Sequence, residues 1–109
     1  MRELAVQALA AWCAAADAPV LLDVREPWEF ELAAIRIPGA STLHIPMGEL
    51  AGRLAEIDRG RPIACICHHG VRSAHVVAFL ARQGFDPVYN LAGGIEAWST
   101  QVDPGVARY

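Results

Sequence analysis

Lysine is absent from this sequence of 109 residues, in which arginine supplies all nine basic side chains and twelve acidic side chains outnumber them. The net charge of −3 argues against a nucleic-acid-binding role, which calls for a clustered basic face. Long apolar runs are missing as well, because no segment reaches the roughly 18 continuous apolar residues that span a membrane. We therefore expect neither nucleic-acid nor membrane partners.

Cysteine is scarce, with three residues at positions 13, 65 and 67. An odd number at these spacings does not suggest a disulfide framework, so we expect a reducing, cytoplasmic setting. Cys13 and Cys65 fall in apolar patterns and are predicted to lie in the core. The Cys-x-Cys-His-His pattern that begins at Cys65 does not match the usual zinc spacings, and no second ligand pair follows it. The sequence therefore predicts no metal and no other cofactor.

Hydrophobic residues make up 54% of the chain, which is enough for one domain over residues 1–109, with a core at about 2–100 and a surface tail at 101–109. Strands are predicted at Val20–Val24, Ser41–Ile45, Pro62–Ile66 and Pro87–Leu91. Helices are predicted at residues 2–16, at 28–32, from Pro46 onward, at 73 to about 84, and at 95–98. Strands that alternate with helices form parallel sheets through right-handed crossovers, which predicts an α/β fold.

The helix predicted at residues 2–16 rests on an apolar stripe that includes Leu4, Leu9 and Cys13 at helical spacing. The small residues at 14–16 could also form a signal-peptidase site. A helix is favoured over a signal peptide, because Glu3 directly follows Arg2 and makes a poor basic region.

The segment from Cys67 to Ser73 joins a predicted strand to a predicted helix, whose apolar positions are Val76, Val77, Leu80 and Ala81. Cys67 therefore lies at the carboxyl end of a strand, where open α/β sheets bind ligands. The N-terminus of the next helix presents unpaired N–H groups and a partial positive charge. These features bind anions and favour the thiolate form of a cysteine. We predict that Cys67 is a nucleophile that attacks negatively charged substrates.

Four segments, in this order along the chain, resemble the signatures of a rhodanese, a sulfurtransferase homology domain. They are Leu22–Glu26 followed by Trp28–Phe30, Ile37–Ala40 with His44–Pro46, the active loop Cys67–Ser73, and Asn90–Trp98. The resemblance covers about residues 2–100. It implies a rhodanese-like three-layer α/β fold, in which a parallel sheet of four to five strands is flanked by helices on both faces.

The resemblance also implies a chemistry. Cys67 would take the sulfane sulfur of a donor such as thiosulfate and carry it as a persulfide. A thiophilic acceptor, which could be a thiol, cyanide or a protein, would then take the sulfur in a ping-pong cycle. The remaining loop residues are implied to bind the substrate: His68, His69, Gly70, Val71, Arg72 and Ser73.

Individual roles follow within the active loop. The backbone N–H groups of residues 68–72 would hold the persulfide and the negative oxygens of the donor. Gly70 would permit the tight curl, because glycine tolerates positive φ. Arg72 would close the loop with a fixed positive charge, and Ser73 would cap the helix.

Two alternatives to a small-molecule sulfurtransferase stay open. One is a sulfur-relay or binding module whose partners are proteins, such as a cysteine desulfurase or a sulfur-carrier activating enzyme. The other is an arsenate reductase or phosphatase-like enzyme. Four residues separate Cys67 from Arg72, whereas related phosphatases and arsenate reductases have one more, which makes room for a tetrahedral oxyanion. The shorter loop favours sulfur.

The loop departs from thiosulfate-specialised relatives, which often carry basic residues early in it. His68 and His69 stand at those places and are mostly neutral at pH 7, while Val71 is apolar. Thiosulfate is therefore expected to be a poor donor, and a protein persulfide or another small sulfane donor is expected to be the natural one.

Several residues near the signatures are interpreted as structural. Asp23 and Arg25 could contact substrate, but a structural ion pair at the strand end is favoured. Glu29 is expected to lie on a solvated helix face. Trp28 and Trp98 are predicted to fill the core, although Trp28 follows a strand end and could instead line the pocket. The last residue, Tyr109, is a candidate anchor for the tail.

Overall fold

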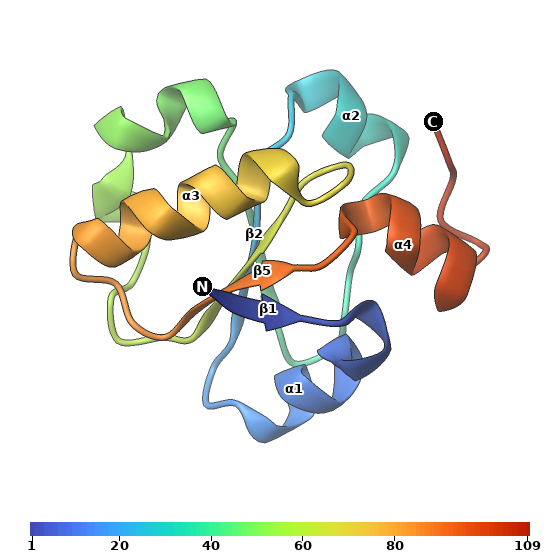
Figure 1. Cartoon of the computed structure of the whole chain (residues 1–109), viewed down its shortest axis with the longest axis horizontal. Coiled ribbons are helices and arrows are strands. Elements are labelled where there is room, and N and C mark those ends of the chain that lie inside the picture. The colour runs from blue at the N-terminus through green and yellow to red at the C-terminus, as the bar shows by residue number, and fades with distance from the viewer.

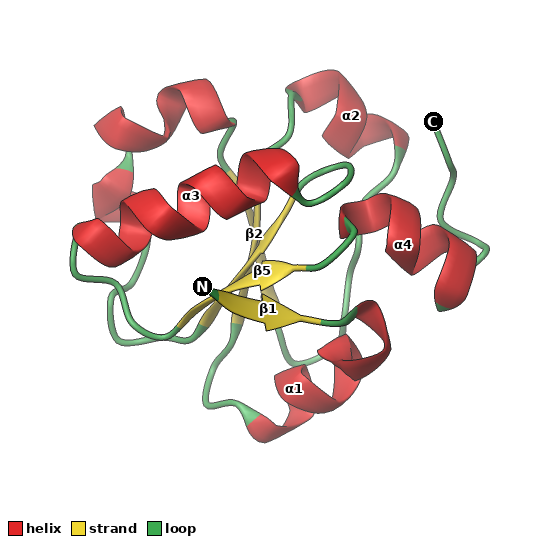
Figure 2. Cartoon of the chain, in the orientation of Figure 1, coloured by secondary structure: helices red, strands yellow, loops and turns green.

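The computed structural model describes residues 1–109 and contains one parallel sheet with helices on both faces (Figures 1 and 2). The strands are β1 (Arg2–Leu4), β2 (Val20–Asp23), β3 (Ser41–His44), β4 (Ile63–Ile66) and β5 (Val88–Leu91). Their order across the sheet is β1-β5-β4-β2-β3. The α-helices are α1 (Leu9–Ala15), α2 (Pro27–Leu32), α3 (Val71–Arg82) and α4 (Gly94–Gln101), and the 3-10 helices are η1 (Val6–Ala8), η2 (Met47–Gly52) and η3 (Leu54–Glu56). The predicted α/β class and parallel sheet are confirmed.

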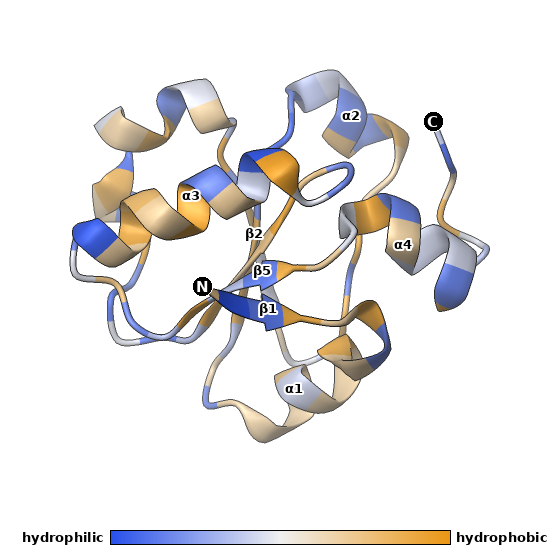
Figure 3. Ribbon diagram, viewed as in Figure 1, coloured by the Kyte–Doolittle hydropathy of each residue, from blue (hydrophilic) through white to orange (hydrophobic).

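Two apolar cores lie on opposite faces of the sheet, because successive side chains of a strand alternate between faces. On β4, Ile63 and Cys65 contribute to the core under α3, and Ala64 and Ile66 contribute to the core under α1 and α4. All four residues of β2 and of β4 are buried. This agrees with the rule that central parallel strands are apolar on both sides. The edge strand β1 differs, because Figure 3 shows it as mainly hydrophilic and its first two residues are exposed.

The prediction of one helix over residues 2–16 is wrong. Arg2–Leu4 forms an edge strand that pairs with β5 in parallel register, with Glu3 opposite Asn90. Leu4 and Val6 are buried, while the alanine at position 5 is exposed. Helical periodicity begins only at Leu9, where α1 starts. Pairing with β5 therefore overrides the helical preference of the first residues.

Three further boundaries differ from the prediction. The segment after Pro46 forms the two short 3-10 helices η2 and η3 instead of one α-helix. Helix α3 begins at Val71, with Gly70 as its N-cap at φ +95°, so Ser73 lies inside the helix and is not its cap. Helix α4 runs to Gln101, beyond the predicted residues 95–98. No helix of the protein is long and apolar enough to cross a membrane.

Candidate active site

The Cys67 thiol lies at the carboxyl end of β4, a central strand of the sheet. The residue is 1% exposed. Three donor groups lie within hydrogen-bond distance of its Sγ: the Gly70 N–H at 3.1 Å, the Ser73 N–H at 3.3 Å and the Ser73 hydroxyl at 3.2 Å. Donors gathered around sulfur stabilise negative charge on it, which suits a cysteine that reacts as a thiolate.

The backbone of the loop is held by the N-terminus of α4. The N–H of Ile95 donates to the carbonyl of Cys67 at 2.9 Å, and the N–H of Glu96 donates to the carbonyl of His68 at 3.0 Å. Gly94 has φ +61°, and a Cβ at this position would lie 2.5 Å from both of those carbonyl oxygens. Only glycine permits this close approach, so the Gly93-Gly94 pair of the sequence determines how the loop is seated.

The loop carbonyls are thus occupied, while several loop amides are not. The N–H groups of His68, His69, Val71 and Arg72 donate to no other group of the protein. Unpaired amides at the start of a helix are the usual means by which proteins bind anions. The loop therefore offers backbone donors for a negatively charged sulfur or oxygen.

Arg72 is paired with Glu29 of α2. Its guanidinium donates to both carboxylate oxygens, at 2.7 and 2.8 Å. Glu29 is 3% exposed, so the prediction that it lies on a solvated helix face is wrong. The hydrogen bonds from Arg72 lower the pKa of Glu29 to about 2 even though burial opposes this, and a hydrogen bond from Tyr109 adds to the lowering. The positive charge of Arg72 is therefore balanced within the protein.

A second ion pair, between Arg25 and Asp23, stabilises the chain at α2. Arg25 is fully buried and donates to both oxygens of Asp23, at 2.9 and 2.7 Å. It also donates to the carbonyls of Glu29 and Ala33, at 3.2 and 2.5 Å. The predicted structural role of this ion pair agrees with these contacts, because they fix the path of the chain through α2.

Tyr109 joins the two ion pairs. Its hydroxyl accepts a hydrogen bond from Arg25 at 2.9 Å and donates one to Glu29 at 2.7 Å. Burial raises the pKa of Tyr109 to about 12, so the hydroxyl keeps its proton and remains a donor. The tail is therefore anchored at Tyr109, as its sequence predicted.

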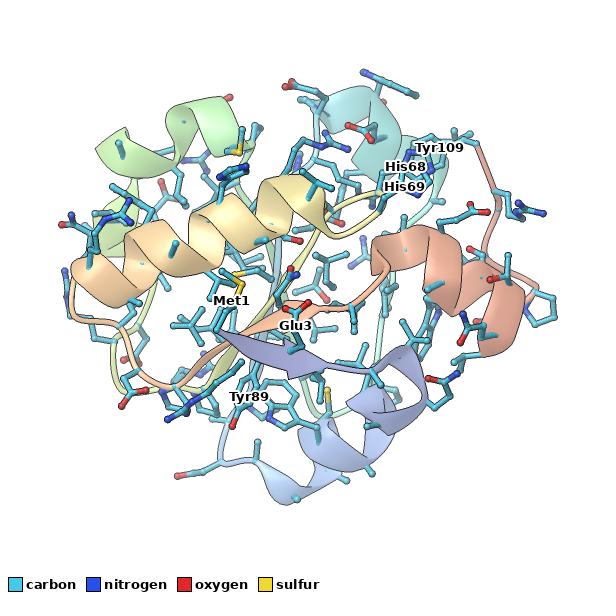
Figure 4. The ribbon with its side chains drawn as sticks, in the orientation of Figure 1. Met1, Glu3, His68, His69, Tyr89 and Tyr109 are labelled. Carbon is cyan, nitrogen blue, oxygen red and sulfur yellow. The ribbon has the colours of Figure 1, made fainter.

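Aromatic and imidazole rings form one side of the site, where His68, His69 and Tyr109 lie together beside α2 (Figure 4). The His68 ring stacks on Tyr109 at 3.9 Å and on His69 at 4.0 Å. Trp28 meets Tyr109 edge-on at 5.7 Å and is 61% exposed, so its predicted place in the core is wrong, whereas Trp98 is buried as predicted. Burial, followed by the neighbouring His69, lowers the pKa of His68, so His68 is neutral at pH 7.

Of the predicted loop residues, Gly70 and Ser73 contact the sulfur of Cys67, and the structure adds three residues to this region that the sequence did not place there. These are Glu29, Tyr109 and Asn90, whose amide contacts Ser73 and Gly70. In the sequence, Glu29 and Asn90 were marked only by lying in segments that resemble rhodanese signatures, and Tyr109 only by its place in the tail. Cys13 and Cys65 are buried and unbonded, as expected. No group of three or more His, Cys, Asp or Glu side chains could hold a metal ion.

Comparison with known proteins identifies the family. The model of the rhodanese-like domain matches residues 5–101. The chain is 38% identical over 81 residues to the thiosulfate sulfurtransferase GlpE of Pseudomonas syringae pv. syringae, which covers 74% of this chain and 73% of that protein. The chain is also 37% identical over 95 residues to the rhodanese-like/PpiC domain-containing protein 12 of Arabidopsis thaliana. This match covers 85% of this chain but only 31% of that longer protein.

Solved structures agree with this assignment. A rhodanese-related protein of Thermoplasma volcanium superposes with a TM-score of 0.81 at 32% identity, over 98% of each chain. An NAD-dependent persulfide reductase from A. fulgidus superposes with a TM-score of 0.66 at 30% identity, over 90% of this chain and 16% of that one. The family model, the sequence relatives and the solved structures agree that the chain belongs to the rhodanese-like domain family.

Proposed function

We propose that this protein is a sulfurtransferase in which Cys67 carries the transferred sulfur as a persulfide. The observation that carries the proposal is the set of three donor groups within hydrogen-bond distance of Sγ, two of them backbone N–H groups and one the Ser73 hydroxyl. A thiolate held in this way is a nucleophile and, later in the cycle, a stabilised leaving group.

The cycle has two displacements. The Cys67 thiolate attacks the outer sulfur of the donor, a new S–S bond forms, and the donor leaves with the electron pair of its broken bond. The persulfide anion on Cys67 then accepts hydrogen bonds from the free loop amides of His68, His69, Val71 and Arg72. An acceptor nucleophile attacks the outer sulfur next, and Sγ leaves as a thiolate.

The relatives support sulfur transfer at the level of the family. The Pseudomonas relative is named as a thiosulfate sulfurtransferase, and the A. fulgidus structure is described as a persulfide reductase. Both names concern sulfur bound to sulfur. The loop of four residues between Cys67 and Arg72 also favours this chemistry over that of an arsenate reductase or phosphatase.

The charges of the site bear on the donor. Arg72 and Arg25 are engaged with Glu29 and Asp23, and His68 is neutral at pH 7 because burial lowers its pKa. The free loop amides then remain as the means to hold a dianion such as thiosulfate. We propose that the physiological donor is a low-charge sulfane compound or a protein persulfide, and that a thiol or a protein takes the sulfur.

A steady-state assay tests the proposal. Wild type and Cys67→Ser are compared with thiosulfate, glutathione persulfide and inorganic polysulfide as donors and with cyanide as acceptor. We expect turnover with all three donors, a higher kcat/KM for the persulfide and polysulfide, and none in Cys67→Ser. Sulfur loading of Cys67 without turnover to cyanide would favour the protein-partnered relay module. Activity that survives in Cys67→Ser would contradict the proposal.

A further inference from the structure

Ser73 has two partners for its one hydroxyl proton. Its Oγ lies 3.2 Å from the Sγ of Cys67 and 2.5 Å from the Oδ1 of Asn90. Ser73 and Asn90 are 0% and 2% exposed, so neither group exchanges its partner freely for bulk water. Because a hydroxyl donates only one hydrogen bond, sulfur and amide oxygen compete for the same proton.

The orientation of the Asn90 amide is fixed by its other contacts. Its Nδ2 lies 3.1 Å from the carbonyl oxygen of Gly70 and 3.3 Å from a carboxylate oxygen of Glu3. Both of these partners are acceptors, so the NH2 group must face them and Oδ1 must face Ser73. An amide oxygen has no proton to offer, so the short contact requires the Ser73 hydroxyl to donate to Asn90.

We propose that Asn90 is a positioning residue for sulfur transfer that acts through Ser73, a role that rests on the proposed function of Cys67. While Sγ is uncharged, as a thiol or as the inner sulfur of the persulfide, Ser73 donates to Asn90. When Sγ becomes a thiolate, the hydroxyl turns toward it and Asn90 loses that hydrogen bond. The Ser73 proton thus changes partner during the cycle without leaving its oxygen.

This exchange fits the electron flow of the transfer step. An acceptor thiolate attacks the outer sulfur of the Cys67 persulfide, and a new S–S bond forms on the acceptor. The old S–S bond breaks and its electron pair stays on Sγ, which is the moment at which Ser73 turns to it. Because the hydroxyl gives up its hydrogen bond to Asn90 when it turns to the thiolate, the net stabilisation of the thiolate is smaller, and the thiolate stays nucleophilic for the next attack on a donor.

Charged and titratable groups around the loop and the amide come from the neighbouring elements: Glu3 on β1, Glu29 on α2, Cys65 on β4, His68 and His69 in the loop, Arg72 on α3, Glu96 on α4, and Tyr109 in the tail. Among them, Glu3 is the one whose side chain contacts the Asn90 side chain. Glu3→Gln is therefore the matched control, because it removes the charge and keeps an oxygen that accepts from the amide.

The test is the pH dependence of Cys67 alkylation by iodoacetamide, read by peptide mass spectrometry. Asn90→Ala is expected to move the midpoint of this profile down by about half to one pH unit, because Ser73 then donates to the thiolate without competition. In a Ser73→Ala background, Asn90→Ala is expected to leave the midpoint of the profile unchanged. Asn90 also holds Gly70, and an effect transmitted through Gly70 would be equal in both backgrounds.

The role of Asn90 would be overturned if Asn90→Ala shifted the alkylation midpoint equally in both backgrounds, or did not shift it when Ser73 is present. A shift of the same size in Glu3→Gln would overturn it as well. Circular dichroism checks that each variant folds, and Asn90→Ser, with the same expectation, replaces Asn90→Ala if the latter does not. Alkylation reports on the thiol whether or not the protein transfers sulfur. Failure of this inference is therefore distinguishable from failure of the proposed function.

Discussion

The Arg72 guanidinium donates to both oxygens of the Glu29 carboxylate, at 2.7 and 2.8 Å, and so ties the start of α3 to α2 beside the Cys67 loop. The sequence predicted that Arg72 closes the loop with a fixed positive charge, and in the structure the buried carboxylate of Glu29 balances that charge. The attraction of the loop for anions therefore depends on its backbone amides. This arrangement leads to predictions on stability, on loop geometry and on the choice of donor.

Glu29→Gln is expected to destabilise the protein by roughly 2–3 kcal/mol at pH 7. The folded-state pKa of Glu29 is about 2, below the ordinary value of 4.5. A depressed carboxyl pKa contributes stability that is fully present above the unfolded value and is lost as pH falls through the folded one. The difference in unfolding free energy between wild type and variant should therefore shrink by roughly half between pH 5 and pH 3. Urea titrations at several pH values measure it, and a difference independent of pH would contradict this reading.

Gly94→Ala is expected to displace the active loop, because the added Cβ would lie 2.5 Å from the carbonyl oxygens of Cys67 and His68. Sulfurtransferase activity should fall at least tenfold, and the melting temperature should fall by several degrees. Gly48→Ala is the control, since a Cβ there meets nothing within 4 Å and the residue is outside the site. Equal activity in the two variants would show that α4 does not seat the loop.

Val71→Arg is expected to improve the use of thiosulfate. Val71 belongs to the loop and is 66% exposed, so an arginine can extend there without disturbing the core. A second, unpaired positive charge near the loop amides should lower the KM for thiosulfate several-fold at low salt, and the gain should shrink as salt screens it. Val71→Gln controls for side-chain length. An unchanged KM would mean that charge in the loop does not limit donor binding.

Acidic pH is expected to favour thiosulfate for a related reason. The pKa of His68 is lowered by burial and then by His69, so His68 gains its charge only below its ordinary range. The kcat/KM for thiosulfate, divided at each pH by the alkylation rate of Cys67, should rise as pH falls from about 8 to 5.5. The rise should vanish in the double variant His68→Gln, His69→Gln. If this ratio does not change with pH in wild type, the charge of the histidines has no part in donor binding.

The central part of the fold and the reactive loop were predictable because their signals are local. Apolar runs mark β2 and β4 as buried strands, and helical spacing after Ser73 marks α3. The edge strand β1 was missed because its three residues carry no clear period and are held by pairing with β5 at the other end of the chain.

The supporting side chains of the site were missed for a similar reason. Glu29 sits 43 positions from Arg72, and Tyr109 sits 80 positions from Glu29. A glutamate in a short helical segment is expected to be solvated, and it is buried here only because Arg72 of α3 and Tyr109 of the tail contact it. Long-range ion pairs of this kind leave no pattern in a single sequence, whereas the loop that they support does.

The persulfide on Cys67 is the central claim, and intact-protein mass spectrometry tests it most directly. Reduced wild type and Cys67→Ser are incubated with excess glutathione persulfide or thiosulfate, desalted and weighed, and the modified residue is located by peptide mapping after alkylation. We predict a gain of one sulfur atom on Cys67 in wild type, its removal by cyanide, and no gain in Cys67→Ser. No gain with either donor, or an equal gain in Cys67→Ser, would contradict the account.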